Sequence, residues 1–289
     1  MIKYTYIKSG GYMKFVFVAD AACDVSEEDK KKYDINIIPI ELNFGDELYP
    51  EGLPDKEYYE KLKNSPILPK TAMPNAYKFQ TFYKDYANKE DVFVITILIS
   101  MELSTTKIQA QSAAEELGMK NVFIEESRVA TVAQGALIVE LAKFCQKEND
   151  IEKIKEEFYR LREKIKLCAI INDLKYLKAS GRLSGAGAAI GGMLNIKPIV
   201  SFVDGKVMNV AKCMGTLKAE NYLVNSINSI DETRPLYLIH SNVLDKAQIL
   251  YERNKDKFNP EQEVKAQGIS YVVGTHVGAG CYGFDYFEK

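Results

Sequence analysis

Three short apolar runs constrain the fold of the first half of the chain. Residues 15–19, 92–99 and 121–125 are rich in strand-forming side chains, and a segment with helical spacing follows each of them. Continuous apolar runs of this length are typical of strands that are buried on both faces of a parallel sheet. Their alternation with helices therefore predicts a parallel, wound α/β sheet.

Polar clusters follow each of the three predicted strands. They comprise residues 20–24, 100–106 and 126–127. Ligands of wound sheets bind beyond the carboxyl ends of the strands. We therefore expect these three clusters to gather at one edge of the sheet.

The second half of the chain has a different pattern. Residues 196–211 read as a hairpin that turns at Asp204 and Gly205, and a type I′ turn is expected there. A strand at 236–240 lies between helices predicted at 218–230 and 247–255. With 289 residues, the chain is long enough for two domains. We predict a tail at 1–12, an N-terminal α/β domain at 13–165 and a C-terminal α/β domain at 166–289.

Composition narrows the classes of function. The formal net charge is −2 and no basic stripe is present, which argues against binding to nucleic acid. The sequence contains no run of 18 apolar residues, so we expect no stable insertion into a membrane. The five cysteines are widely spaced without a CxxC pair, so we expect neither a zinc site nor a disulfide framework. A reducing cytoplasm suits such cysteines. No metal or cofactor is expected.

The C-terminal residues 269–280 contain one of only two histidines in the chain. We interpret this segment as a strand that leads into a glycine-rich turn, with His276 at the lip of the turn. Glycines allow close approach of the backbone to a ligand, and an imidazole can contact an acidic group. Arg182 follows Gly181 at a predicted helix end, which favours contact with an anion. A buried structural histidine and a solvated arginine are the alternatives.

Two other interpretations, dinucleotide binding and ester hydrolysis, lack the sequence motifs that typically accompany them. Glycines cluster at 185, 187, 191 and 192, but Ile190 occupies the sixth position of a GxGxxG frame and a helix precedes the segment. We expect a helix at 185–194 that packs closely or lines a long apolar ligand. Ser104 lacks the flanking glycines of a nucleophile elbow. A hydrolase using His276 with Ser100 or Ser104 remains an alternative.

Six segments, taken in order, resemble the DegV family of bacterial fatty-acid-binding proteins, which includes the acyl-carrying subunit of fatty acid kinase. The resemblance runs from Met13 onward. Its segments are Asp20-Ala-Ala-Cys-Asp24, Thr71-Ala-Met-Pro74, Ser100-Met-Glu-Leu-Ser-Thr-Thr106, Gly181-Arg-Leu183, Leu194-Asn-Ile-Lys-Pro198 and Gly274-Thr-His-Val-Gly-Ala-Gly280.

The resemblance implies a two-domain α/β protein that holds one long-chain fatty acid, such as palmitate, in a tunnel between the domains. Hydroxyls of Thr71 and Ser100 would hold the carboxylate, with Arg182 and His276 nearby. Met101 and Ser104 lie in the same motif as Ser100, and we assign them to the same site. The resemblance therefore implies a binding protein without catalytic residues, whose ligand is the fatty acid.

Several positions depart from the family pattern. Ala21, Ala72 and Met101 stand where the family has serine, and Thr105 stands where it has glycine. Residues 213–215 also lack an arginine that family members often carry. The predicted head-group site is therefore less polar here. These changes favour lipid binding over presentation of an acyl phosphate, so partnership with an ATP-dependent fatty acid kinase is an alternative function.

Overall fold

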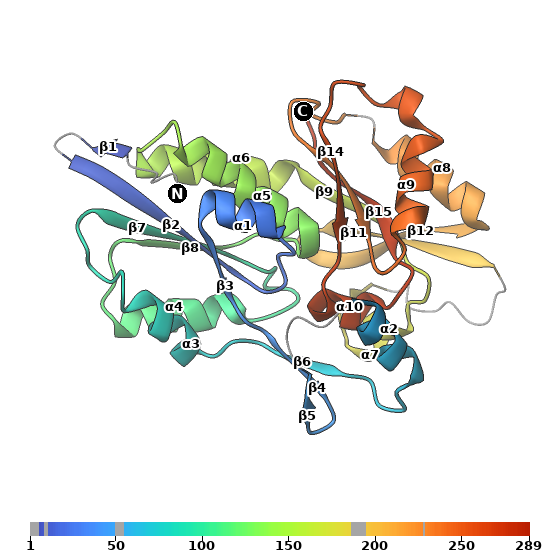
Figure 1. The fold of residues 1–289 in the computed structure, drawn as a ribbon, viewed down its shortest axis with the longest axis horizontal. Coiled ribbons are helices and arrows are strands. Elements are labelled where there is room, and N and C mark those ends of the chain that lie inside the picture. Colours follow the sequence, from blue (N-terminus) through green and yellow to red (C-terminus); the bar gives the residue numbers. More distant parts are fainter. Residues whose placement is uncertain (1–5, 9–10, 50–54, 186–194, 228) are drawn as a thin grey trace. The chain divides into compact units, whose positions relative to one another are not determined.

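A computed structural model describes the chain except for residues 1–5, 9–10, 50–54, 186–194 and 228 (Figure 1). Contacts divide the chain into two compact units. The first comprises Met1–Glu41, Ala72–Ala130 and Gln134–Glu163, and the second comprises Leu42–Thr71, Thr131–Ala133 and Lys164–Lys289. The main difference from the predicted division at residue 165 is the segment Leu42–Thr71, which groups with the second unit.

The first unit is built on a largely parallel sheet with the strand order β1-β2-β7-β8, in which β3 also pairs with β2. All of these pairs are parallel except β1 with β2. The wound parallel sheet predicted from the apolar runs is therefore confirmed. The strands are β1 (Tyr6–Lys8), β2 (Gly11–Asp20), β3 (Ile35–Ile38), β7 (Val92–Leu98) and β8 (Val122–Glu126).

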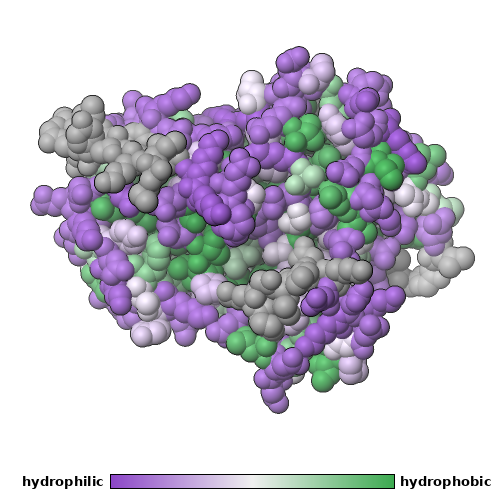
Figure 2. Space-filling model, viewed as in Figure 1, coloured by the Kyte–Doolittle hydropathy of each residue, from purple (hydrophilic) through white to green (hydrophobic). Residues whose placement is uncertain are grey.

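Helices cover both faces of this sheet (Figure 1). One face is covered by α3 (Ala76–Tyr83) and α4 (Thr106–Glu116), and the other by α1 (Glu27–Tyr33), α5 (Thr131–Cys145) and α6 (Ile151–Lys164). Val94 and Ile95 on β7 are consequently 0% exposed, which explains why the strand is apolar throughout. Figure 2 shows that the visible face is mostly hydrophilic, with hydrophobic side chains in small patches.

The chain leaves the first sheet after Ile38, just before Pro39, which has no N–H to donate to a sheet. It enters a small sheet with the order β5-β4-β6, formed by β4 (Glu41–Phe44), β5 (Glu47–Leu48) and β6 (Lys70–Ala72). Helix α2 (Asp55–Asn64) lies between β5 and β6 in the sequence. Phe44 and Tyr58 pack in one aromatic cluster, against which Tyr271 is packed. This cluster explains why the segment groups with the second unit.

The second unit contains a mixed sheet with the order β10-β12-β11-β9-β15-β13-β14. Helices α8 (Thr216–Ser226) and α9 (Leu244–Glu252) pack against it, and Leu223 and Leu250 share a buried cluster with Leu236 and Phe284. The sheet strands are β9 (Ile165–Ile170), β10 (Leu183–Ser184), β11 (Ile196–Val203), β12 (Lys206–Met214), β13 (Leu236–His240), β14 (Val264–Gly268) and β15 (Tyr282–Phe287).

In the second unit the predicted hairpin turn and the short helix before Arg182 are confirmed, and a third prediction falls on residues that are not described. The β11–β12 hairpin turns at Asp204 (φ 48°) and Gly205 (φ 80°), as a type I′ turn requires. The short helix before Arg182 is α7 (Lys175–Ala179). The helix predicted at 185–194 lies, apart from Gly185, outside the described residues.

The predicted strand that carries His276 is wrong. Residues Tyr271–Val277 form a short helix, α10, in which the N–H groups of Gly274 and Gly278 donate to the carbonyls four residues earlier. Valines at 272, 273 and 277 favour a strand, but a short buried apolar run has the same pattern in either structure. Val272 and Val273 are both buried, and their tertiary packing stabilises the helix.

Candidate functional site

The polar segments after β2, β7 and β8 meet at one edge of the first sheet, as predicted. The carboxylate of Asp20, at the end of β2, accepts a hydrogen bond of 2.8 Å from the N–H of Ile99. The N–H of Met101 donates to Oε2 of Glu126 at 2.6 Å. These contacts join the three strand ends within the first unit.

Asp20 is fully buried at this edge. Its carboxylate accepts hydrogen bonds from the N–H groups of Ala22 and Ile99, and the Gln134 amide lies 3.5 Å away. Burial raises the pKa of Asp20 to about 6, although these hydrogen bonds act in the opposite direction. Asp20 therefore ties two loops together, which gives the opening motif a structural role.

Ser100 shapes the turn that follows β7. Its carbonyl accepts hydrogen bonds from the N–H groups of Leu103 and Ser104, at 3.0 and 3.1 Å. Its Oγ accepts one from the N–H of Glu102 at 3.3 Å, and the residue is 0% exposed. The hydroxyl predicted to bind a carboxylate is thus already part of the turn.

Met73 lies against the same turn. The hydroxyl of Ser104 lies 2.8 Å from that of Thr106 and donates to the sulfur of Met73 at 3.7 Å. The Thr105 hydroxyl donates to this sulfur at 3.2 Å. Met101, which stands where the family has serine, has an exposed side chain. The first unit therefore brings together Ser100, Met101 and Ser104 of the predicted site.

Thr71, Arg182 and His276 come together in the second unit. The hydroxyl of Thr71, on β6, lies 3.1 Å from Nε2 of His276, on α10. Arg182 follows α7, and Nη1 of its guanidinium donates to the Ser180 carbonyl. Its charge acts on the imidazole of His276. All three side chains are half-buried.

The environment of His276 keeps its imidazole neutral at pH 7. Burial, followed by repulsion from the Arg182 guanidinium, lowers the pKa of His276 to about 4. Nε2 faces Thr71, while the buried Nδ1 has no hydrogen-bond partner among the described residues. A neutral imidazole beside a cation can take part in holding an anion without itself supplying charge.

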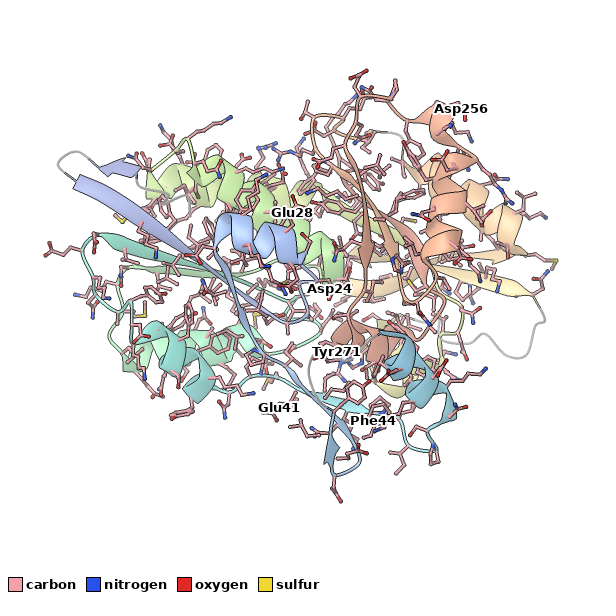
Figure 3. All side chains as sticks on the ribbon, in the orientation of Figure 1. Asp24, Glu28, Glu41, Phe44, Asp256 and Tyr271 are labelled. Carbon is pink, nitrogen blue, oxygen red and sulfur yellow. The ribbon has the colours of Figure 1, made fainter. Side chains whose placement is uncertain are left out.

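The glycines beside His276 have a packing role that the sequence did not suggest. A Cβ on Gly274 would lie 2.3 Å from the Tyr59 hydroxyl oxygen. On Gly278, whose φ is 72°, a Cβ would lie 2.5 Å from the ring of Tyr176. Tyr271 of α10, which is labelled in Figure 3, packs against the cluster that contains Phe44. No motif marks Tyr59 or Tyr176, because their partners are distant in sequence.

The described part of the chain offers neither a metal site nor a membrane-spanning helix. There, no group of three or more His, Cys, Asp or Glu residues could hold a metal ion. No helix in that part is both long enough and apolar enough to cross a membrane.

Comparison with known families and proteins gives matches along nearly the whole chain. A family model described as "Uncharacterised protein, DegV family" matches residues 14–289. A DegV domain-containing protein of Listeria innocua is 28% identical over 282 residues, covering 96% of this chain and 99% of that protein. One from Clostridium perfringens is 30% identical over 284 residues, with coverage of 92% and 95%.

Solved structures share the fold. A Thermus thermophilus DegV family protein, described by its fatty acid binding, has a TM-score of 0.87 at 23% identity, covering 96% of this chain and 100% of that one. DegV of Bacillus subtilis, described as a fatty acid binding protein, has a TM-score of 0.83 at 26% identity, with the same coverage. A stearic-acid-binding protein of Eubacterium ventriosum has a TM-score of 0.80 at 20% identity, with coverage of 95% and 98%.

Proposed function

This chain belongs to the DegV family, and we propose that its function is to bind a long-chain fatty acid. The observation that carries the proposal is the Thr71–His276 pair, whose polar atoms lie 3.1 Å apart beside the charge of Arg182. A carboxylate removed from water needs hydrogen-bond donors and a nearby cation. These three side chains supply both.

The protonation state of the pair suits an anionic ligand. If Nε2–H of the neutral His276 donates to Thr71, the hydroxyl proton of Thr71 is left to donate to a carboxylate oxygen. Arg182 uses one of its five N–H groups on the Ser180 carbonyl and provides the positive charge. Binding the anion would also offset the repulsion between Arg182 and a protonated His276, so we expect the pKa of His276 to rise in the complex.

The proteins of similar structure support the ligand class. The Bacillus subtilis and Thermus thermophilus proteins are both described as binding fatty acid. A buried CH₂ contributes about 0.8 kcal/mol, so a sixteen-carbon tail contributes roughly 10 kcal/mol before costs. The tail should therefore dominate affinity, and the polar residues should set its orientation. From the family resemblance, we place the tail in a tunnel between the domains.

The same geometry favours binding over catalysis. A hydroxyl hydrogen-bonded to an imidazole is the arrangement of a nucleophile and its base. Such a base needs a pKa near the working pH and a group that orients its second nitrogen. The pKa of His276 is lowered to about 4, and its Nδ1 has no partner in the described residues. Turnover of an ester that disappears in His276→Ala would support the hydrolase alternative instead.

Lipid extraction and native mass spectrometry of the purified protein test the proposal. We expect a bound long-chain acid, and a rise in Tm when palmitate is added to delipidated protein. His276→Ala should retain the fold and lose palmitate faster. Arg160→Ala, which changes an exposed residue of α6 in the first unit, should lose palmitate at the wild-type rate. Absence of acyl chains together with an unchanged Tm would refute the proposal.

The kinase partnership implied by the resemblance stays a separate prediction. Loaded protein, incubated with ATP and the catalytic subunit of a fatty acid kinase, should yield acyl phosphate if the partnership is real. A loaded protein that gives none would restrict the function to carrying the lipid.

A further inference from the structure

We propose that Tyr58 is a positioning residue for the carboxylate site, because it holds α10, and with it His276, against α2. This inference rests on the proposed function. Tyr58 forms no described hydrogen bond with Thr71 or Arg182, so it would act on the site through its contacts with α10.

The hydroxyl of Tyr58 donates to that of Thr275. Their oxygens lie 2.7 Å apart, and both residues are buried. Thr275 uses its own proton on the carbonyl of Tyr271, also at 2.7 Å. Because a threonine hydroxyl has only one proton, the proton between the two oxygens must come from Tyr58. Tyr58 is thus fixed as the donor to the residue next to His276.

Tyrosine rings also limit the position of α10 on both sides of His276. Tyr59 occupies the space where Gly274 would carry a Cβ, and Tyr176 occupies that space at Gly278. The Tyr58 ring lies 5.1 Å from the Tyr59 ring and 5.9 Å from the Tyr271 ring, between centroids. A seven-residue helix rich in β-branched side chains has little stability of its own. Its position must therefore come from these contacts.

The segment that holds α10 also carries Thr71. Tyr58 lies on α2, and Thr71 lies on β6, in the same excursion of the chain, Leu42–Thr71. Docking α10 on α2 therefore brings His276 close to the segment that carries its hydroxyl partner, Thr71. Without the Tyr58 bond, α10 should shift and expose the imidazole to water.

The test is Tyr58→Phe, which removes the hydroxyl and keeps the ring. NMR titration of the protein without ligand should show the pKa of His276 rising by about one unit, because burial is the main cause of its low value. Palmitate affinity should fall about tenfold, the lower end of the loss seen when the partners that orient metal ligands are removed.

A matched control separates positioning from stability. Tyr83→Phe removes a buried tyrosine hydroxyl that lies 2.8 Å from Thr96 in the first unit. It should lower Tm as Tyr58→Phe does, and change neither the His276 titration nor palmitate affinity. Thr275→Val removes the Tyr58 bond from the other side and should reproduce the shift in titration.

The outcomes are distinguishable from failure of the proposed function. The His276 titration needs no ligand, so a shift in Tyr58→Phe supports positioning even if the wild type binds no palmitate. A wild type that binds palmitate, with titration and affinity unchanged in Tyr58→Phe and Thr275→Val, would overturn the inference. Equal shifts in Tyr83→Phe would overturn it as well.

Discussion

The hydroxyl of Thr71 lies 3.1 Å from Nε2 of His276, although 205 positions separate the two residues in the sequence. Both belong to the second unit, so one compact body holds the pair together. Arg182 adds a positive charge to this pair from the end of α7. The proposed anion site therefore draws on β6, α10 and the turn after α7, and none of these segments could form it alone.

Removing the charge of Arg182 should affect both the histidine and the ligand. In Arg182→Ala, we expect the pKa of His276 to rise above about 4 and to stay below 6.5, because burial, the larger cause of the shift, remains. Palmitate affinity should fall roughly tenfold or more, since hydrogen bonds to charged groups contribute about 1.5–3 kcal/mol. NMR titration and equilibrium binding measure the two effects. An unchanged affinity would remove Arg182 from the site.

His276 should make the protein less stable in acid. Its pKa is about 4 in the folded state and 6.5 as an unperturbed group, so the unfolded chain binds a proton first as the pH falls. Stability is therefore lost between pH 6.5 and 4, by up to about 3 kcal/mol. Urea unfolding at pH 7 and 4.5 should show a larger decrease in the free energy of unfolding for the wild type than for His276→Gln. Equal losses would contradict this.

Asp20 should act in the opposite direction. Its pKa is about 6 in the folded state and 3.8 as an unperturbed group, so the native state binds the extra proton between these values. This contribution is fully present below pH 3.8 and is lost as the pH rises through 6. As the pH falls from 7 to 4, the free energy of unfolding of the wild type should therefore rise by about 2 kcal/mol relative to that of Asp20→Asn. Parallel stability profiles of the two proteins would show that the carboxyl is not perturbed.

Gly274→Ala should displace α10. Its Cβ would lie 2.3 Å from the Tyr59 hydroxyl oxygen, and overpacking of this kind costs about 1–3 kcal/mol. The cost should be smaller in a Tyr59→Phe background, because the nearest clashing atom is gone. A double-mutant cycle by denaturant unfolding measures this coupling. Additive losses would mean that the two residues do not compete for the same space.

The parallel sheet of the first unit could be predicted because its strands are buried on both faces. That burial produces the apolar runs around Phe15 and Val94, and parallel pairing then gathers their polar ends at one edge. Thr71, Arg182 and His276 could be identified through a family resemblance whose motifs are local in sequence. In the second unit Thr71 lies 3.1 Å from His276, and the charge of Arg182 acts on the imidazole, while their role in holding a carboxylate stays a prediction.

The helical state of α10 could not be predicted, because its valines have the same pattern in a buried helix and in a buried strand. The tyrosines that pack against it could not be found either. Tyr59 and Gly274 are linked only by a contact between distant segments, and no spacing within one element encodes it. The grouping of Leu42–Thr71 with the second unit depends on the same contacts.

The excursion of the chain through α2 has a consequence for biosynthesis. Tyr58 precedes its partner Thr275 by 217 residues. At 5–20 residues per second, translation of that interval takes on the order of 10 to 40 s. For much of this time the aromatic residues of α2 have left the ribosome, while α10, which packs against them, has not been made. The proposed carboxylate site can therefore form only after His276 has been synthesised, long after Thr71.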